Sequence, residues 1–359
     1  MATKPSQESS KNETPKNPLI SKTRSSVVDQ FKSKRKAAFD VDALCDSLLK
    51  GNITALSRAI TLIESTKPEH RPLAQDLLHR CLPYSNSSKR IGITGVPGVG
   101  KSSFIEAFGC LVASPSNKVA VLAVDPSSSI SKGSVLGDKT RMQELSRHPD
   151  VFIRPSPAGS TLGGVARKTR ETILLCEAFG FQTILVETVG VGQSETVVHS
   201  MVDFFLVLKL SGAGDELQGI KRGIIELADS IVINKADGDN LQRAKIARSE
   251  FSKALKLYPP KENGWKPKVL LTSAIENKGI IEVNELIEDY IKTAKENHSF
   301  DTKRLEQNKF WLYQSIEEHL KESFYQNPEI QKALRLQLKA IEEHKITPFA
   351  AAQYLISLL

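Results

Sequence analysis

The stretch IGITGVPGVGKSS, residues 91–103, decides the fold class because it joins a short β-branched run to a glycine-rich loop and a helical pattern. Residues 95–102 match the phosphate-binding pattern GxxxxGK[ST] in full. The glycines let consecutive backbone N–H groups curl around a phosphate, and the next helix adds the positive end of its dipole. The nucleotide contacts expected from this loop are Gly95, Val96, Pro97, Gly98, Val99, Gly100, Lys101, Ser102 and Ser103.

Charged and hydroxyl side chains near this loop predict a magnesium site. We expect Lys101 to reach the β- and γ-phosphates and the Ser102 hydroxyl to ligate Mg²⁺. Mg²⁺ prefers oxygen ligands, and ligands of open parallel sheets lie at the carboxyl ends of strands, so carboxylates are expected there. The candidates are Asp125, Asp138 and Glu187, which with Lys101 form the expected catalytic set and with Ser102 the expected metal ligands. The alternatives are a glycine-rich turn that only packs a helix on a sheet, and solvated loop carboxylates.

Outward from the loop, short β-branched runs alternate with helical stretches. Besides Ile91–Thr94, the runs that predict strands are Val119–Val124, Val151–Arg154, Thr183–Glu187, Phe204–Leu208, Ser230–Asn234 and Val269–Ser273. Between most of them lies an amphipathic pattern of helical length, which indicates βα units with helices on both faces of the sheet. The sequence therefore predicts an α/β fold, a P-loop NTPase domain with a mostly parallel sheet.

Helical patterns flank this domain on both sides. We expect four units in the chain, namely a basic disordered tail, an N-terminal helical segment, a P-loop nucleotide-binding domain and a C-terminal helical segment, over residues 1–38, 39–88, 89–297 and 298–359. The tail accounts for most of the formal net charge of +8, because residues 1–36 hold nine Lys or Arg against three Asp or Glu. The remaining body is nearly neutral, so nucleic acid is not an expected partner.

A second motif predicts the base. Asn234-Lys235-Ala236-Asp237 follows a strand and fits the NKxD element of GTPases. The Asp237 carboxylate can accept hydrogen bonds from guanine N1–H and N2–H₂, whereas adenine presents an acceptor at N1 and is repelled. Guanine contacts are expected from Asn234, Lys235 and Asp237, with Ser273, Ala274 and Ile275 closing the pocket and Gly190 following Glu187 near the phosphates.

Composition narrows the class further. No window approaches 18 uninterrupted apolar residues, so a membrane span is not expected. The four cysteines lie far apart in the sequence among apolar neighbours, and no Cys/His cluster indicates zinc, so buried reduced thiols are expected. The tail has Glu8 and Glu13 and no Arg before Arg24, which fits poorly with a mitochondrial presequence. We therefore expect a cytoplasmic protein, with the mitochondrial matrix as the alternative.

These residues resemble the methylmalonyl-CoA mutase-associated GTPases, metallochaperone-type P-loop GTPases formerly labelled arginine/ornithine transport ATPases. The matching stretches, in family order, are ITGVPGVGKSS (93–103), VDPSSSISKGSVLGDKTRM (124–142), SPAGSTLGGVA (156–166), ILVETVGVGQSE (184–195), SGAGDELQGIKRG (211–223) and INKAD (233–237). The resemblance runs from about Leu44 to the C-terminus. Lys132, where glycine is common, and Ser103, where threonine is usual, are small departures.

The resemblance implies that Asp125, Asp138 and Glu187 organise Mg²⁺ and the γ-phosphate, and that residues 212–223 form a switch facing the partner. It also implies a homodimer built by the C-terminal helices. The family's function would be a GTP-dependent chaperone that gates adenosylcobalamin loading of a B12-dependent methylmalonyl-CoA mutase and protects it. The element Glu187-Thr188-Val189-Gly190 replaces DxxG and has no glutamine directly after Gly190, so intrinsic hydrolysis is expected to be slow.

Two other functions fit parts of the sequence. An ATPase or kinase linked to amino-acid transport would share the phosphate loop, but the NKAD element argues against adenine. A metal-insertion GTPase for another enzyme, such as one that inserts nickel, should carry a His-rich tract or a Cys/His pair, and none is found in the sequence. A competition test of GTP against ATP distinguishes the first alternative from a GTPase.

Overall fold

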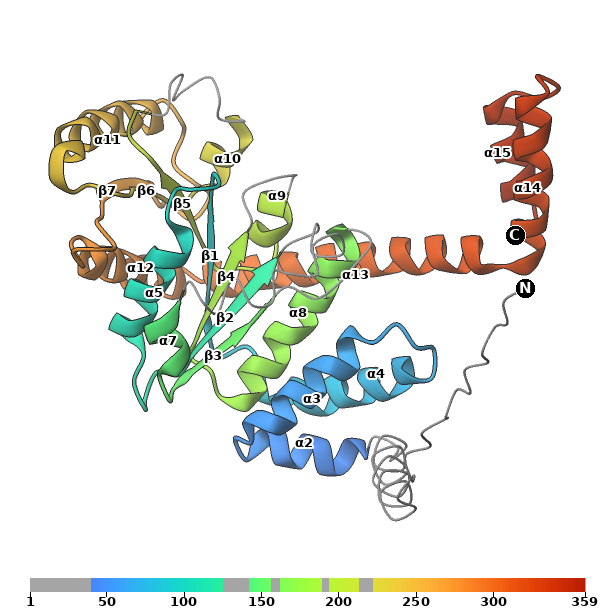
Figure 1. Cartoon of the computed structure of the whole chain (residues 1–359), viewed down its shortest axis with the longest axis horizontal. Coiled ribbons are helices and arrows are strands. Elements are labelled where there is room, and N and C mark those ends of the chain that lie inside the picture. The colour runs from blue at the N-terminus through green and yellow to red at the C-terminus, as the bar shows by residue number, and fades with distance from the viewer. Residues whose placement is uncertain (1–39, 125–141, 156–161, 189–193, 213–221, 359) are drawn as a thin grey trace, which may run out of the picture.

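The computed structural model describes residues 40–124, 142–155, 162–188, 194–212 and 222–358 (Figure 1). Its centre is a seven-stranded sheet in the order β3-β2-β4-β1-β5-β6-β7, with every neighbouring pair parallel. The strands are β1 (Lys89–Gly95), β2 (Val119–Val124), β3 (Val151–Arg154), β4 (Thr183–Thr188), β5 (Phe204–Lys209), β6 (Ser230–Ile233) and β7 (Lys268–Leu271). The predicted α/β fold with a parallel sheet is confirmed, and each predicted strand lies within two residues of its observed ends.

Helices cover both faces of the sheet because the side chains of each strand alternate between them. Val119 and Val121 of β2 pack in the core on one face, whereas Ala120 and Leu122 pack in the core on the other. The first face carries α5 (Lys101–Val112), α7 (Gln143–Arg147) and α12 (Ile280–Glu296). The second carries α8 (Leu162–Phe179), α9 (Ser194–His199), α10 (Arg222–Leu227) and α11 (Leu241–Leu255).

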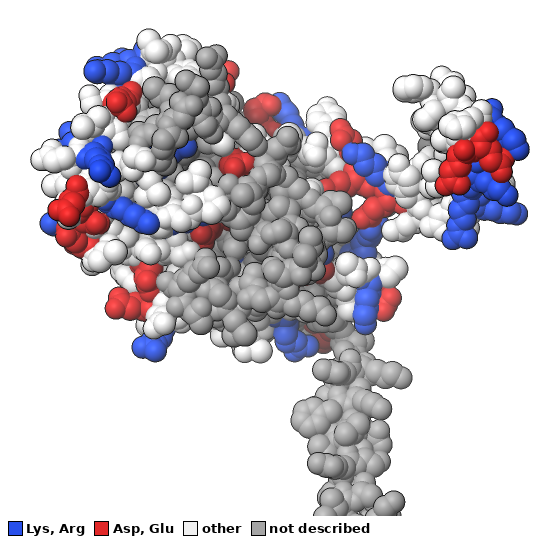
Figure 2. Space-filling view, turned by 45° about the horizontal axis from the view of Figure 1, so that its top comes forward, with Lys and Arg blue, Asp and Glu red and all other residues white. Residues whose placement is uncertain are grey.

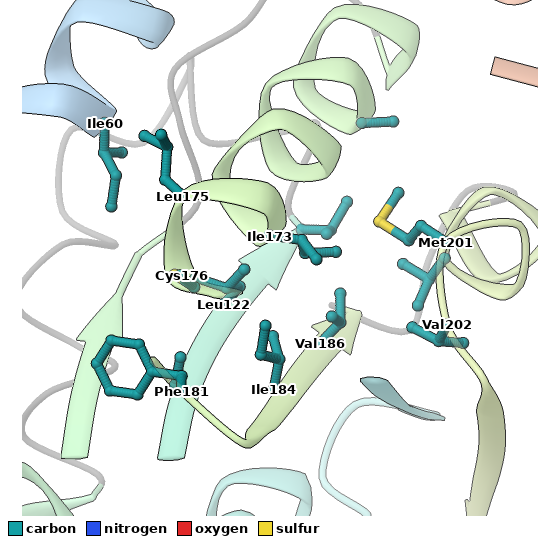
Figure 3. Close-up of a cluster of buried hydrophobic side chains, with 14 of the residues drawn as sticks. Ile60, Leu122, Ile173, Leu175, Cys176, Phe181, Ile184, Val186, Met201 and Val202 are labelled. Carbon is teal, nitrogen blue, oxygen red and sulfur yellow. The ribbon is translucent and has the colours of Figure 1, made fainter. Parts of the chain in front are cut away.

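The core on the second face is built around α8. Figure 3 shows Ile173 and Cys176 of this helix lying over Leu122 of β2 and over Ile184 and Val186 of β4. All five side chains are 0–2% exposed. Burial of this apolar surface fixes α8 across the middle of the sheet, and so fixes the strand ends that the site uses.

The N-terminal helices pack on the outer side of α8. They are α2 (Val41–Leu49), α3 (Ile53–Glu64) and α4 (His70–Cys81), followed by the 3-10 turn η1 (Leu82–Tyr84). Asp40 and Asn52 begin the first two helices, since their side chains accept hydrogen bonds from backbone N–H groups of the first turn. The sulfur atoms of Cys45 and Cys81, 36 residues apart in the chain, lie 3.8 Å apart in this layer.

All four cysteines are free thiols. Cys45, Cys81 and Cys176 are buried, as expected, but Cys110 is only half-buried near the end of α5. In that position burial and the charges of Glu106 and Glu144 raise the pKa of the Cys110 thiol. The expectation of buried reduced thiols is therefore confirmed for three of the four.

The C-terminal helices leave the sheet as an arm. α13 (Ser299–Gln326) runs past α8, and α14 (Pro328–Glu342) and α15 (Pro348–Ile356) fold against each other beyond its end (Figure 1). A buried ion pair fixes the beginning of α13: Arg304 donates to both carboxylate oxygens of Asp203, from Nε at 2.9 Å and from Nη2 at 2.8 Å. Arg304 also donates to the carbonyls of Asn86 and Ser88, both at 2.6 Å. This one side chain thus ties the arm to the starts of β1 and β5.

Charges of both signs are interleaved over the described part of the surface in Figure 2, including the arm. On that face Lys and Arg do not gather into a single basic stripe of the kind that tracks a nucleic-acid backbone. No described helix is both long and apolar enough to cross a membrane.

Candidate active site

The phosphate loop lies between β1, which ends at Gly95, and α5, which begins at Lys101. Gly98 and Gly100 have φ angles of 81° and 90°, a left-handed conformation that favours glycine. At Gly100 a Cβ atom would also lie 2.8 Å from Nδ2 of Asn234. Glycine is therefore required there both by the backbone conformation and by the close approach of another loop.

Lys101 folds back over the loop that precedes it. Its Nζ donates to the carbonyl of Gly95 at 2.7 Å and to that of Val96 at 3.3 Å, and the residue is 8% exposed. Burial lowers the pKa of the Lys101 ammonium, while the negative charges of Glu187 and Glu195 oppose the shift. The structure thus places a partly desolvated cation inside the loop that the sequence assigns to phosphate.

Two carboxylates act on this cation. Glu187 is half-buried on β4, in register with Ile93 of β1 and Ala123 of β2, where the carboxyl ends of three strands meet. Glu195 of α9 is 6% exposed and was not among the predicted site residues, although it closes the stretch ILVETVGVGQSE at residues 184–195. The sequence signal that could have identified Glu195 is its position as a carboxylate at the end of a glycine-rich stretch that follows a strand.

Part of the expected magnesium site can be placed. Ser102, half-buried, and Ser103, exposed, lie in the first turn of α5 directly after Lys101. Asp125, Asp138 and Gly190 lie outside the described residues, although β2 ends at Val124, the residue before Asp125. Within the described ranges no group of three or more His, Cys, Asp or Glu could hold a metal ion. The Ser102 hydroxyl and the Glu187 carboxylate are oxygen donors of the type that Mg²⁺ binds.

The predicted base motif reaches the phosphate loop directly. Asn234, 1% exposed at the end of β6, donates from Nδ2 to the carbonyl of Val99 at 2.9 Å. Its Oδ1 accepts from the Thr272 hydroxyl at 3.1 Å, which joins it to the loop after β7. The three predicted elements around residues 95–102, 234–237 and 272–275 are therefore brought together by one buried amide.

The Asp237 carboxylate, which is predicted to bind the base, is held by the loop after β7. The Ser273 hydroxyl donates to Oδ2 of Asp237 at 2.5 Å, and the backbone N–H of Ala236 donates to the carbonyl of Thr272 at 2.9 Å. Ala274 is half-buried and Ile275 is 83% exposed. An exposed apolar side chain in the loop that holds this carboxylate suits one wall of a planar base.

A tight turn returns the chain from this loop to α12. Backbone hydrogen bonds pair Ser273 with Lys278 in both directions, at 2.9 and 3.0 Å. Gly279 has a φ of 75°, and a Cβ atom there would lie 2.0 Å from the carbonyl oxygen of Leu271. Only glycine fits this position, so the turn fixes Ser273 and with it the carboxylate of Asp237.

The family profile described as "Methylmalonyl Co-A mutase-associated GTPase MeaB" matches residues 56–329. The chain belongs to this family. The match covers most of the described structure, including the phosphate loop, the base motif and the anchored part of α13. The resemblance inferred from the sequence is thereby confirmed.

Relatives support the assignment of enzyme class. A probable GTPase of Mycobacterium tuberculosis is 48% identical, covering 89% of this chain and 95% of that protein. The mitochondrial methylmalonic aciduria type A homolog of Mus musculus is 44% identical, covering 88% of this chain and 79% of that protein. The crystal structure of a LAO/AO transport system kinase is 38% identical with a TM-score of 0.70, covering 89% of this chain and 97% of that one. This member of the MeaB family is a GTPase.

Proposed function

We propose that this GTPase uses nucleotide binding and hydrolysis to gate the loading of adenosylcobalamin into a B12-dependent methylmalonyl-CoA mutase and to protect that enzyme. The observation that carries the proposal is the junction made by Asn234, which joins the phosphate loop, the base motif and the loop after β7. A nucleotide spanning this junction would meet Lys101 at its phosphates and Asp237 at its base. Membership of a family described by its association with the mutase supports the choice of client.

Guanine is the base that these side chains suit. Ser273 already donates to one oxygen of the Asp237 carboxylate, which leaves acceptor capacity for the two donors of guanine. Adenine would place its N1 acceptor against the same carboxylate, so the site disfavours it. The assay is displacement of fluorescently labelled GDP by unlabelled GTP and ATP: we expect GTP to compete at least a hundredfold better, and equal competition would favour an ATPase or kinase.

We assign hydrolysis to Lys101 at the start of α5, to Glu187 on β4 and to the carboxylates of Asp125 and Asp138. Lys101 would neutralise the charge that develops on the β- and γ-phosphate oxygens, and Ser102 with Glu187, Asp125 and Asp138 would hold Mg²⁺, which supplies charge neutralisation when bound. Glu187 replaces the aspartate of the DxxG element, and no glutamine directly follows Gly190. We therefore expect slow turnover that a partner accelerates.

The proposed client is tested by measuring whether it stimulates GTP hydrolysis. Phosphate release from GTP is measured with the full chain alone and with a purified methylmalonyl-CoA mutase added in equal amount. We expect the mutase to raise the rate at least several-fold, and an unrelated acyl-CoA enzyme to leave it unchanged. An unchanged rate with the mutase would remove the proposed client while leaving the GTPase assignment in place.

The arm is proposed to form a homodimer. Its solvent-facing side carries large apolar side chains that are 46–66% exposed: Leu312, Tyr313, Ile316, Leu320, Tyr325, Leu336 and Leu338. Large apolar side chains exposed to this extent on one pair of helices support an interaction site there. Light scattering should give twice the chain mass, and the double variant L320E/L336E should run as a monomer that still binds GDP. We propose that the arm spans residues 298–359. The proposed location of the protein is the cytoplasm.

A further inference from the structure

Asn240 lies three residues after the base motif, at the end of the 3-10 turn η2 (Gly238–Asn240). Its side chain is half-buried between two loops. Nδ2 donates to the backbone carbonyl of Lys235 at 2.6 Å, and Oδ1 lies 2.8 Å from the hydroxyl of Ser211. Ser211 follows the end of β5, so this one amide connects two strand ends of the sheet.

The orientation of the amide follows from its partners. A carbonyl oxygen only accepts hydrogen bonds, so the NH₂ group of Asn240 must face Lys235. Its oxygen then faces Ser211, whose hydroxyl is the donor. Both ends of the side chain are used, and reversing the amide would place two acceptors against each other at Lys235.

The carbonyl that Asn240 holds belongs to a residue in an uncommon conformation. Lys235 has a φ of 55°, in the left-handed region that residues with a Cβ rarely adopt. Such a conformation persists where surrounding contacts fix it. The backbone N–H of Asn240 also donates to the carbonyl of Asp237 at 3.0 Å, so Asn240 contacts the loop on both sides of Ala236.

We propose that Asn240 is a positioning residue for base recognition. By holding the carbonyls of Lys235 and Asp237, it sets the direction in which the Asp237 carboxylate points, and Ser211 holds Asn240 in turn. The inference rests on the proposed role of Asp237 toward guanine. It assigns part of the base specificity to two side chains outside the NKxD motif, one of them in the loop after β5.

The test compares two nucleotides that differ in one group. Inosine diphosphate lacks the 2-amino group of guanine but keeps N1–H, so the ratio of GDP to IDP affinity measures the second contact of Asp237. We expect N240A to reduce this ratio about three- to tenfold, the value of one hydrogen bond. S211A should reduce it less, and S211T, which keeps the hydroxyl, should restore it.

Two controls separate positioning from general damage. Asp239 is an exposed neighbour on the same turn, and D239A should leave the ratio unchanged. Loss of fold would lower GDP and IDP affinity together, and the S211A and S211T pair provides the same comparison if N240A is unstable.

The outcomes are distinct. If the wild type binds GDP, IDP and ADP equally, the proposed base site itself fails. If the wild type prefers GDP but N240A and S211A both keep its GDP to IDP ratio within twofold, the base site stands and the role of Asn240 is refuted.

Discussion

Replacing Arg304 by alanine tests whether one buried side chain fixes the arm to the nucleotide domain. Arg304 is 6% exposed and makes four hydrogen bonds, two to the Asp203 carboxylate and two to backbone carbonyls. Asp203 is 1% exposed and would keep one donor, the backbone N–H of Arg90 at 2.9 Å. The variant therefore leaves the buried Asp203 carboxylate without its ion-pair partner and with fewer hydrogen-bond donors.

The expected cost follows from these contacts. Removing one partner of a buried ion pair costs about 3–5 kcal/mol. Because Asp203 retains the N–H of Arg90, we expect the lower part of that range, about 3–4 kcal/mol in the free energy of unfolding. At about 2–4 °C per kcal/mol for a domain of this size, the melting temperature should fall by about 10 °C.

Thermal melts followed by circular dichroism and by tryptophan fluorescence provide the assay. Trp311 on α13 donates from its indole N–H to the carbonyl of Ser200 at 3.1 Å, so its emission reports release of the arm. K309A removes an exposed pair with Glu306 on the same helix and should cost less than about 0.5 kcal/mol. A loss below about 1 kcal/mol in R304A would refute the reasoning.

Three further predictions concern the site and the pH dependence of stability. K101A should lower the rate of phosphate release from GTP by at least about a hundredfold while the melting temperature changes little, and wild-type turnover would contradict the assignment of Lys101. D237N should shift binding from guanosine towards xanthosine nucleotides, because an amide can donate to the C2 carbonyl of xanthine; unchanged preference in displacement assays would contradict the role of Asp237. Burial raises the pKa of Glu171 from 4.5 to about 7, against the opposing charges of Arg167 and Lys168. Between these values the folded state holds a proton that the unfolded chain has lost, so stability falls as pH rises from about 5 to 7. E171Q should remove this slope and raise the denaturation midpoint at pH 8, and an equal slope in both proteins would show that another group titrates.

The strands and the phosphate loop could be predicted because their signals are local. A β-branched run such as Val119–Val124 forms a buried strand wherever it lies in the sheet, and the glycines at 98 and 100 match a backbone conformation that few other residues adopt. The family could be inferred for the same reason, because the longer stretches that match it are also continuous in the sequence.

The contacts that assemble the site could not be predicted in this way. Asn234 and Val99 are 135 residues apart, and Arg304 and Asp203 are 101 residues apart, so neither pairing leaves a pattern in one sequence. Glu195 was missed for a similar reason, since its burial beside Lys101 depends on how α9 packs. Asp125 and Asp138 stay predictions, because they lie outside the described residues.

The amide of Asn234 has a consequence for how this protein can evolve. Since it donates to the carbonyl of Val99 and accepts from Thr272, any replacement at this position alters the phosphate loop and the base loop at once. Among the described residues, the side chain of Asp237 bonds to Ser273 rather than to the phosphate loop. A change of preferred base is therefore more accessible through substitutions at Asp237 and Ser273. A substitution at Asn234 would require compensating changes in two loops at the same time.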